Sequence, residues 1–262
     1  MGHRAEDHVS MTTIDVHAYY GKWGFPICPM SIEDILRQME RANVEKAILM
    51  SARAIQYDFV QGNAELADAI APHDNLYGYV YINMHYPDLS LREMERYLFE
   101  DKFVGAKYNG EYSRAAVSAE ENREVFDLLE IEYQKPLLLH TWGTAEHGNA
   151  AAYSLPSQAL RLAQDHPELS IVMGHMGGTE WMSAISAARE ASNLYLDTCA
   201  SYADLDKVGV AVSELGAERV LFGSGTTEGS LYMQRGVILD ADLTPEERSL
   251  VLYGNASRIF KI

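Results

Sequence analysis

Short apolar runs alternate with longer amphipathic stretches along the chain from Thr12 onward. Each run is rich in β-forming residues and continuously apolar, which is typical of strands buried on both faces. The runs cover residues 13–17, 46–51, 77–83, 103–108, 136–140, 170–175, 194–198 and 219–224. We therefore predict eight strands that alternate with helices in a parallel sheet.

Three of the amphipathic stretches begin with a helix-capping pattern. Ser31, Ser118 and Thr244 each stand three residues before an acidic residue, and Pro245 follows Thr244 directly. A hydroxyl and an acid at this spacing can each accept a hydrogen bond from the other's backbone N–H, and proline favours the first helical position. We predict that a helix begins at each of the three hydroxyl residues.

The spacing of the predicted strands favours a closed barrel. Successive strand ends, from His17 to Gly225, lie 23 to 35 residues apart, close to the ~30 residues of a strand–helix–strand unit. A doubly wound sheet is the alternative, but residues 20–24 lack the glycine spacing of a dinucleotide-binding turn. We predict an α/β fold, a single-domain (β/α)8 TIM barrel over residues 12–262, after a polar extension at residues 1–11.

The composition limits the classes of partner. The formal net charge of −17 disfavours nucleic acids and anionic membrane surfaces. No apolar run reaches the ~18 residues of a membrane-spanning helix. The two cysteines, Cys28 and Cys199, cannot form a disulfide framework, and the N-terminus lacks a signal-peptide pattern. We expect a cytoplasmic protein that acts on a small molecule.

Four chemically active residues stand at predicted strand ends. His17, Lys107, His140 and His175 close the first, fourth, fifth and sixth strands. The active site of a TIM barrel is built at the C-terminal ends of its strands, so these side chains should converge. Converging imidazoles suit a divalent metal or proton transfer. The alternative is that each histidine only caps its strand by bonding to a backbone carbonyl.

The sequence around these strand ends resembles the amidohydrolase superfamily, particularly its amidohydrolase-related branch. The opening IDVHA at residues 14–18 carries the likeness, which continues in family order to Phe260. The further matching segments are VGAK (104–107), PLLLH (136–140), VMGHMGG (172–178), YLDT (195–198), VLFGS (220–224) and GNASRIF (254–260). The resemblance implies hydrolysis of C–N or C–O bonds or, in some branches, non-oxidative decarboxylation, usually with zinc or manganese.

The chain departs from the family pattern at the metal site. The family has His-x-His where residues 17–19 read His-Ala-Tyr, and Gly-Ser-Asp where residues 223–225 read Gly-Ser-Gly. The missing aspartate serves the family as a ligand and as the base toward water. The resemblance leaves His17 and His140 as ligand positions, and His175 matches a histidine that assists the chemistry or binds a second metal.

A metal site rebuilt from the remaining histidines is one outcome that we consider. His17, His140 and His175 with a water would form a competent set for zinc, and manganese is the other candidate. Without such regrouping, the protein would hold no metal, and a histidine would activate water directly. Further candidate ligands are Glu146, His147 and Glu228.

The catalytic roles follow from the chemistry of the side chains. His175 is our candidate for proton transfer, because imidazole titrates near neutral pH. Lys107 and Tyr19 are expected to hold the negative charge of the substrate or to stabilise an oxyanion. The alternative for Lys107 is an ion pair with Asp15 or Asp197.

Substrate-binding residues are expected in the loops that follow the strands. Residues 141–156 form a long connection, and Trp142 and His147 within it are candidates for a loop over the site. Arg53 could clamp an anionic group or could simply be solvated. Cys199 is expected to be a small residue at a strand end, without an activated thiolate.

Three functions are consistent with these residues. The main interpretation is a hydrolase of a C–N or C–O bond, in an amide or lactone, of a small molecule, and the aromatic residues near the strand ends suit a small cyclic or aromatic acid, lactone or amide. The first alternative is a decarboxylase, with a metal or Lys107 as electron sink. The second alternative is an inactive barrel that binds a ligand. Barrels of this kind often pair, and a homodimer is one arrangement that we consider.

Overall fold

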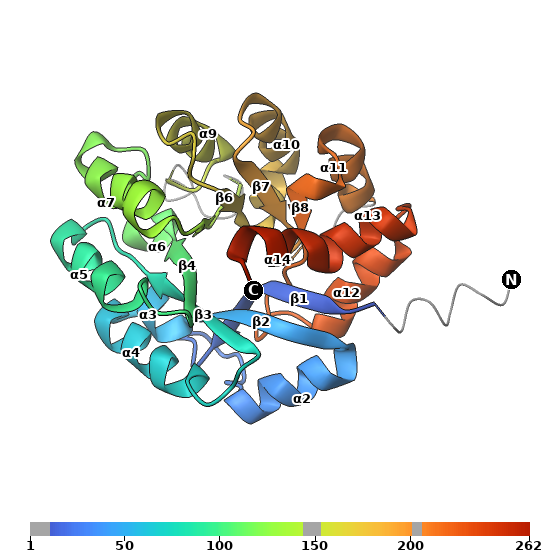
Figure 1. Cartoon of the computed structure of the whole chain (residues 1–262), viewed down its shortest axis with the longest axis horizontal. Coiled ribbons are helices and arrows are strands. Elements are labelled where there is room, and N and C mark those ends of the chain that lie inside the picture. Colours follow the sequence, from blue (N-terminus) through green and yellow to red (C-terminus); the bar gives the residue numbers. More distant parts are fainter. Residues whose placement is uncertain (1–10, 144–152, 201–205) are drawn as a thin grey trace, which may run out of the picture.

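The computed structural model describes residues 11–143, 153–200 and 206–262. Eight parallel strands follow one another in chain order around the sheet, from β1 to β8 (Figure 1). They are β1 (Thr13–Tyr20), β2 (Val44–Ser51), β3 (Leu76–Tyr81), β4 (Phe103–Tyr108), β5 (Leu137–Leu139), β6 (Ile171–Met173), β7 (Leu194–Asp197) and β8 (Val220–Leu221). The predicted (β/α)8 barrel is confirmed.

Backbone hydrogen bonds join the last strand to the first. The Val16 N–H donates to the Phe222 carbonyl at 3.0 Å, and the Gly225 N–H donates to the His17 carbonyl at 2.8 Å. The sheet is therefore closed, and the loop that follows β8 lies directly beside the histidine at the end of the predicted first strand.

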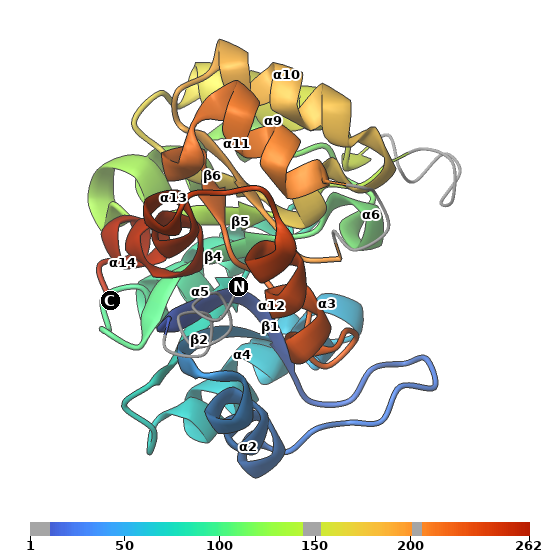
Figure 2. The ribbon, with the colours of Figure 1, turned by 90° about the vertical axis from the view of Figure 1, so that its right-hand side faces the viewer.

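Helices surround the barrel, and α9, α10 and α11 lie on the side opposite α2 and α4 (Figures 1 and 2). The α-helices are α2 (Ile32–Ala42), α3 (Ala52–Gln56), α4 (Phe59–Ile70), α5 (Pro87–Tyr97), α6 (Gly110–Ser113), α7 (Arg123–Leu128), α9 (Pro156–Asp165), α10 (Trp181–Glu190), α11 (Lys207–Leu215), α12 (Leu231–Asp240), α13 (Pro245–Ser249) and α14 (Asn255–Phe260). The 3-10 and π segments are η1 (Glu120–Asn122), η2 (Leu129–Tyr133), η4 (Gly174–Glu180), η5 (Ala217–Arg219) and η6 (Leu250–Gly254). Among the described residues, no helix is long and apolar enough to span a membrane.

Two of the three predicted helix caps are confirmed. Ser31 and Thr244 each form the reciprocal capping pair, and Pro245 begins α13. The prediction for Ser118 is wrong, because its hydroxyl donates instead to the Gln158 side chain at 2.6 Å. This bond ties the segment before η1 to α9, and Ala119 takes the cap position without a side-chain bond.

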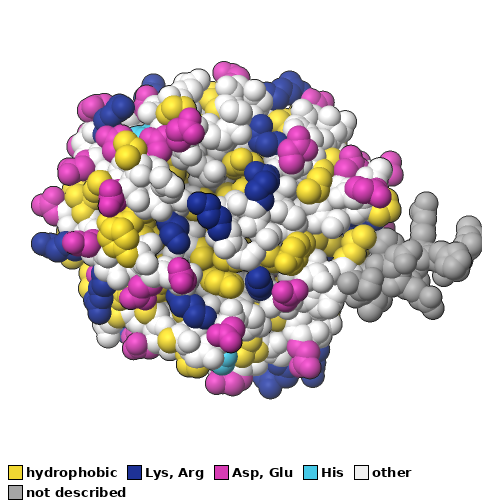
Figure 3. Space-filling view, in the orientation of Figure 1, with side chains coloured by type: hydrophobic (Ala, Val, Ile, Leu, Met, Phe, Trp, Pro, Cys, Tyr) yellow, Lys and Arg dark blue, Asp and Glu magenta, His cyan; other side chains and the backbone are white. Residues whose placement is uncertain are grey.

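The hydrophobic core has two layers, one inside the barrel and one between the strands and the helices. Phe260 of α14 belongs to the inner layer, and its ring packs edge-on against Tyr79 with the centroids 5.7 Å apart. Helix α14 thus closes the end of the barrel that faces the viewer in Figure 1. Acidic and basic side chains are interspersed over this face (Figure 3). The C-terminal ends of the strands lie at the opposite end.

Candidate active site

His17 stands at the centre of the C-terminal end of the barrel and is fully buried. Two glycines make room for its side chain. A Cβ added at Gly223 would lie 2.8 Å from the His17 Cβ, and one added at Gly174 would lie 3.1 Å from the His17 Cε1. The turns after β6 and β8 therefore approach the imidazole at distances that a larger residue would block.

One carboxylate organises the surroundings of His17. Asp197 Oδ2 accepts from His17 Nδ1 at 2.6 Å, and Asp197 Oδ1 accepts from the backbone N–H groups of His175 and Cys199 at 3.0 and 2.9 Å. Burial opposes ionisation of Asp197, but the hydrogen bond from His17 and the interactions with His17, His175 and Lys107 outweigh burial and lower the pKa of Asp197 to about 2. Burial lowers the pKa of His17. We assign an ionised Asp197 and a neutral His17 that carries its proton on Nδ1.

A second buried carboxylate, Asp15, stands two residues before His17 on β1. Its oxygens accept from the His17 and Ser224 backbone N–H groups at 3.1 and 3.0 Å, and from the Ser224 hydroxyl. Burial raises the pKa of Asp15 to about 6, although these hydrogen bonds act in the opposite direction. Asp15 therefore links β1 to the turn after β8 and does not face the cavity.

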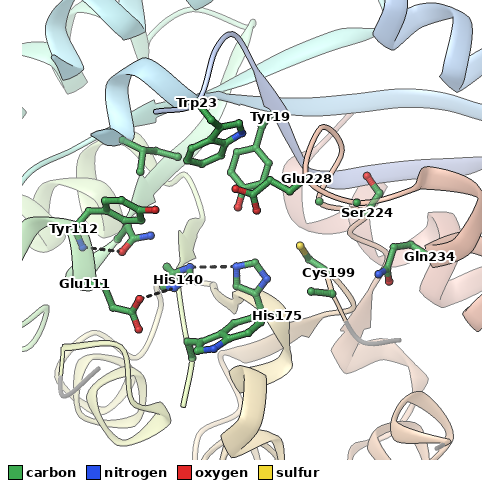
Figure 4. Close-up of a pocket in the computed structure, with 16 residues that line it drawn as sticks. Tyr19, Trp23, Glu111, Tyr112, His140, His175, Cys199, Ser224, Glu228 and Gln234 are labelled. Carbon is green, nitrogen blue, oxygen red and sulfur yellow. Dashed lines mark hydrogen bonds and ion pairs between the residues drawn. The ribbon is translucent and has the colours of Figure 1, made fainter. Parts of the chain in front are cut away.

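His175 and His140 form a hydrogen-bonded pair. His175 Nε2 lies 3.1 Å from His140 Nδ1, and His140 Nε2 lies 3.6 Å from a carboxylate oxygen of Glu111 (Figure 4). Burial holds the pKa of His175 well below its ordinary value, so the ring is neutral. His175 has a backbone φ of +61°, in the left-handed region that non-glycine residues seldom adopt. Such strain concentrates at functional sites.

A cavity of about 260 Å³ opens above this pair (Figure 4). Its walls contain four large aromatic side chains and several polar ones. The lining residues are Tyr19, Trp23, Ile55, Asn109, Glu111, Tyr112, His140, Trp142, His175, Cys199, Ala200, Ser224, Gly225, Glu228, Gly229 and Gln234. In the described part of the chain, the amide atoms of Gln234 and the indole N–H of Trp23 have no hydrogen-bond partner. These buried polar groups are therefore available to a bound molecule.

Glu228 brings an ionisable group to the cavity beside Tyr19 (Figure 4). The residue is exposed to the cavity, yet protein atoms surround its carboxyl on most sides. The resulting desolvation raises the pKa of Glu228 to about 7, although the charge of Lys107 lowers it. We considered Glu228 from the sequence only as a metal ligand, because its place in a loop gives no sign of this desolvation.

Lys107 is fully buried and does not line the cavity. Its Nζ has no hydrogen-bond partner among the residues that the structure describes, so the alternative that we considered, an ion pair with Asp15 or Asp197, does not form. Burial lowers the pKa of Lys107 to about 8, and the charge of Asp197 limits this change. From this position the charge of Lys107 lowers the pKa of Asp197 and of Glu228, and its role toward a substrate stays a prediction.

The three candidate substrate-binding residues differ in their position relative to the cavity. Trp142 lies in the cavity wall, where its ring packs edge-on against His175 with the centroids 5.0 Å apart. Arg53 lies outside the cavity, because its guanidinium donates to Glu65 at 2.7 Å and to Gln61 at 2.6 Å. His147 lies outside the described residues.

Several cavity residues were missing from the sequence-based prediction. Glu111 follows the fourth strand closely, and a search of every loop after a strand end would have included it. Gln234 lies on α12 and Trp23 lies beyond the first strand, and nothing in the sequence distinguishes either residue from others of its type.

Three residues of the site fit a metal ion. His17, His175 and Cys199 are buried, and each offers a ring nitrogen or a sulfur atom within 4.8 Å of the other two. Because His17 Nδ1 is bonded to Asp197, the lone pair of His17 is on Nε2, where the Tyr19 hydroxyl donates at 2.9 Å. An ion that binds His17 would take the place of this hydrogen bond. His140 lies beside this group and contacts it through His175.

The barrel and its buried centre of histidines and carboxylates define an enzyme fold with its site at the strand ends. The chain belongs to the amidohydrolase family, because the Amidohydrolase (Amidohydro_2) family model matches residues 14–262. The resemblance stated from the sequence is confirmed.

Two curated relatives are decarboxylases. The chain is 25% identical to the gamma-resorcylate decarboxylase of Rhodococcus jostii, over 89% of this chain and 88% of the relative. It is 24% identical to the enzyme of the same name from Polaromonas, over 87% and 86% of the two chains. These relatives support the decarboxylase alternative and not the hydrolase that was our main interpretation.

Solved structures of the same kind share the fold. A 2,6-dihydroxybenzoate decarboxylase from Rhizobium superposes with a TM-score of 0.80 at 19% identity, covering 96% of this chain and 99% of that chain. A dihydroxybenzoic acid decarboxylase from Polaromonas, solved with bound manganese and 2-nitroresorcinol, gives 0.79 at 20% identity, covering 95% and 97%.

Proposed function

We propose that this protein is a decarboxylase of a small hydroxylated aromatic carboxylic acid. The observation that carries the proposal is the cavity of about 260 Å³, which combines aromatic walls with a carboxyl group whose pKa is near neutral. Flat apolar walls suit a single aromatic ring, and polar groups at a few points fix its orientation. The two curated decarboxylase relatives support the same reaction class.

Glu228 is the proton donor in this proposal. A hydroxyl group ortho to the substrate carboxylate supplies electron density to the ring, and the ring carbon that bears the carboxylate takes the proton of Glu228. The C–C bond to the carboxylate then breaks, and its electron pair returns to the ring as CO₂ leaves. A proton from solvent restores the Glu228 carboxyl. The overall change replaces a carboxylate by hydrogen and requires no oxidant.

The other cavity residues orient the ring. Gln234 and Trp23 offer unpartnered polar groups to the oxygen atoms of the substrate. His140, held between His175 and Glu111, can accept a hydrogen bond from a phenol or donate one to a phenolate. A divalent cation at His17, His175 and Cys199 would act as a Lewis acid toward substrate oxygens.

Release of CO₂ from a panel of ortho-hydroxybenzoates, including 2,6-dihydroxybenzoate, tests the proposal. We expect turnover of at least one acid and a fall in kcat of about 10²–10⁴-fold in Glu228→Gln, the range for loss of a general acid. Glu40→Gln, which changes an exposed glutamate of α2, is the matched control. Hydrolysis of an amide or lactone without CO₂ release would contradict the proposal, as would ligand binding without turnover.

A further inference from the structure

Cys199 occupies the space in which the side chain of residue 225 would lie. A Cβ added at Gly225 would meet the Cys199 Sγ at 2.8 Å and no other atom within 4 Å. Gly225 also has a φ of +69°, which disfavours any larger residue there. The sulfur atom and a side chain at residue 225 are therefore alternatives for one position beside the cavity.

The sulfur at this position has two nitrogen donors beside it. Cys199, His17 and His175 bring their donor atoms within 4.8 Å of one another, and all three residues are at least nine-tenths buried. His175 Nδ1 is buried without a hydrogen-bond partner in the described part of the chain. A buried imidazole nitrogen without a partner raises the free energy of the folded protein, and a bound ion would remove this penalty.

The surroundings hold these donors in place. Asp197 accepts the Nδ1 proton of His17, which is the arrangement that orients histidine ligands in metal sites. The same carboxylate accepts the backbone N–H groups of His175 and Cys199. One buried side chain thus fixes all three donor residues before any ion binds.

We propose that His17, His175 and Cys199 form a cation site with two nitrogen donors and one sulfur donor, selective for zinc over manganese. Thiolate and imidazole ligands favour zinc, whereas manganese favours carboxylate, carbonyl and water oxygens. Cys199 takes the place that a carboxylate at residue 225 would occupy and thereby changes the donor set from oxygen to sulfur. This inference rests on the geometry and is independent of the proposed decarboxylation.

Cobalt substitution and X-ray absorption test the site directly. We expect Co²⁺ to give a near-ultraviolet thiolate-to-cobalt charge-transfer band in the wild-type protein and in Cys28→Ser, the control at the exposed cysteine. We expect Cys199→Ser to lose the band and to bind zinc at least about 10–100-fold more weakly. X-ray absorption of zinc-loaded wild-type protein should show a sulfur neighbour at about 2.3 Å, a result that needs no variant to fold.

Several outcomes would overturn the inference. A first coordination sphere of nitrogen and oxygen only would do so, as would a charge-transfer band that persists in Cys199→Ser or tighter binding of manganese than of zinc. The two proposals fail separately. A cobalt band without CO₂ release would support the cation site and contradict the decarboxylase. CO₂ release without the band would support the decarboxylase and contradict the cation site.

Discussion

The two halves of the site differ in how completely their polar atoms are bonded. In the buried half, formed by His17, Asp197 and Asp15, the carboxylates accept hydrogen bonds from donors on β1 and in the segments that follow β6, β7 and β8. In the cavity half, Gln234 and Trp23 keep polar atoms without a partner among the described residues. The buried half is therefore preorganised, and the cavity half is completed only by a ligand.

Asp197→Asn should produce the largest effect, because it disrupts the buried half at its centre. An amide removes the charge that accepts the proton of the neutral His17, and a hydrogen bond to a charged group contributes about 1.5–3 kcal/mol to the unfolding free energy. We also expect activity to fall by at least about 10–100-fold, since the orientation of His17 depends on this carboxylate. Urea unfolding and CO₂ release measure the two effects.

Asp74→Asn, in an exposed turn, is the control for this variant. A loss of activity with full stability would mean that Asp197 acts only on the chemistry. Wild-type activity in Asp197→Asn would refute the distinction between the two halves.

The pH dependence of the reaction rate should report the ionisation of Glu228 in the cavity half. Burial raises the pKa of Glu228 to about 7, and only its protonated form can donate a proton. The rate should therefore be highest below pH 7 and fall about tenfold per pH unit above it, and Glu228→Gln should lose this dependence. The charged groups that influence Glu228 are Lys107 and, on ionisation, Tyr19, Tyr112 and Cys199. A rate that rises through pH 7 would assign Glu228 as a base.

Lys107→Met should stabilise the protein. A folded pKa of about 8, against 10.5 for a free lysine, corresponds to about 3 kcal/mol, because the folded state resists the charge. This cost is fully present below pH 8 and disappears as the pH rises through 10.5. We expect unfolding free energy to increase by about 1–3 kcal/mol at pH 7 and not at pH 11. Lys22→Met, at an exposed lysine, is the control. Destabilisation at pH 7 would instead mean that Asp197 holds the ammonium group.

Gln234→Leu should weaken substrate binding without changing the chemical step. A hydrogen bond from a neutral amide contributes about 0.5–1.5 kcal/mol, so KM should rise about 2–10-fold while kcat stays within about twofold. Steady-state kinetics with the best substrate of the panel measure both constants. An unchanged KM would show that Gln234 does not meet the ligand.

Arg53→Ala should have the smallest effect. Its ion pair with Glu65 is on the surface, where such pairs contribute about 0–1 kcal/mol, and the residue lies outside the cavity. We expect KM and kcat within about twofold of wild type. A loss of substrate binding in this variant would instead support the interpretation that Arg53 binds an anionic group of the substrate.

The sequence predicted the fold well, because its signals are local. Continuous apolar runs and the capping pairs at Ser31 and Thr244 depend on neighbours within a few residues. The failure at Ser118 has a long-range cause, since Gln158 lies 40 positions away. Histidines at strand ends were equally visible, because barrel geometry converts a strand end into a position in the site.

The chemistry of the site was less predictable. The contact between Cys199 and Gly225 depends on how two separate turns approach each other. No spacing of residues in the sequence encodes this approach. The neutral pKa of Glu228 and the unbonded Nζ of Lys107 depend on burial and surroundings that only the folded chain defines. The sequence therefore located the site and most of its histidines, whereas the roles of its acids and its thiol required the structure.

The most direct test of the account follows the carboxyl carbon of 2,6-dihydroxybenzoate, the acid in the name of the Rhizobium structure. The acid, labelled with ¹³C at its carboxyl group, is incubated with the zinc-loaded protein in D₂O and followed by NMR. We expect labelled bicarbonate together with deuterium at the ring carbon that lost the carboxylate, and about 10²–10⁴-fold slower formation of both in Glu228→Gln. An acid that remains intact while an amide or lactone is hydrolysed at the same site would contradict decarboxylation by this protein.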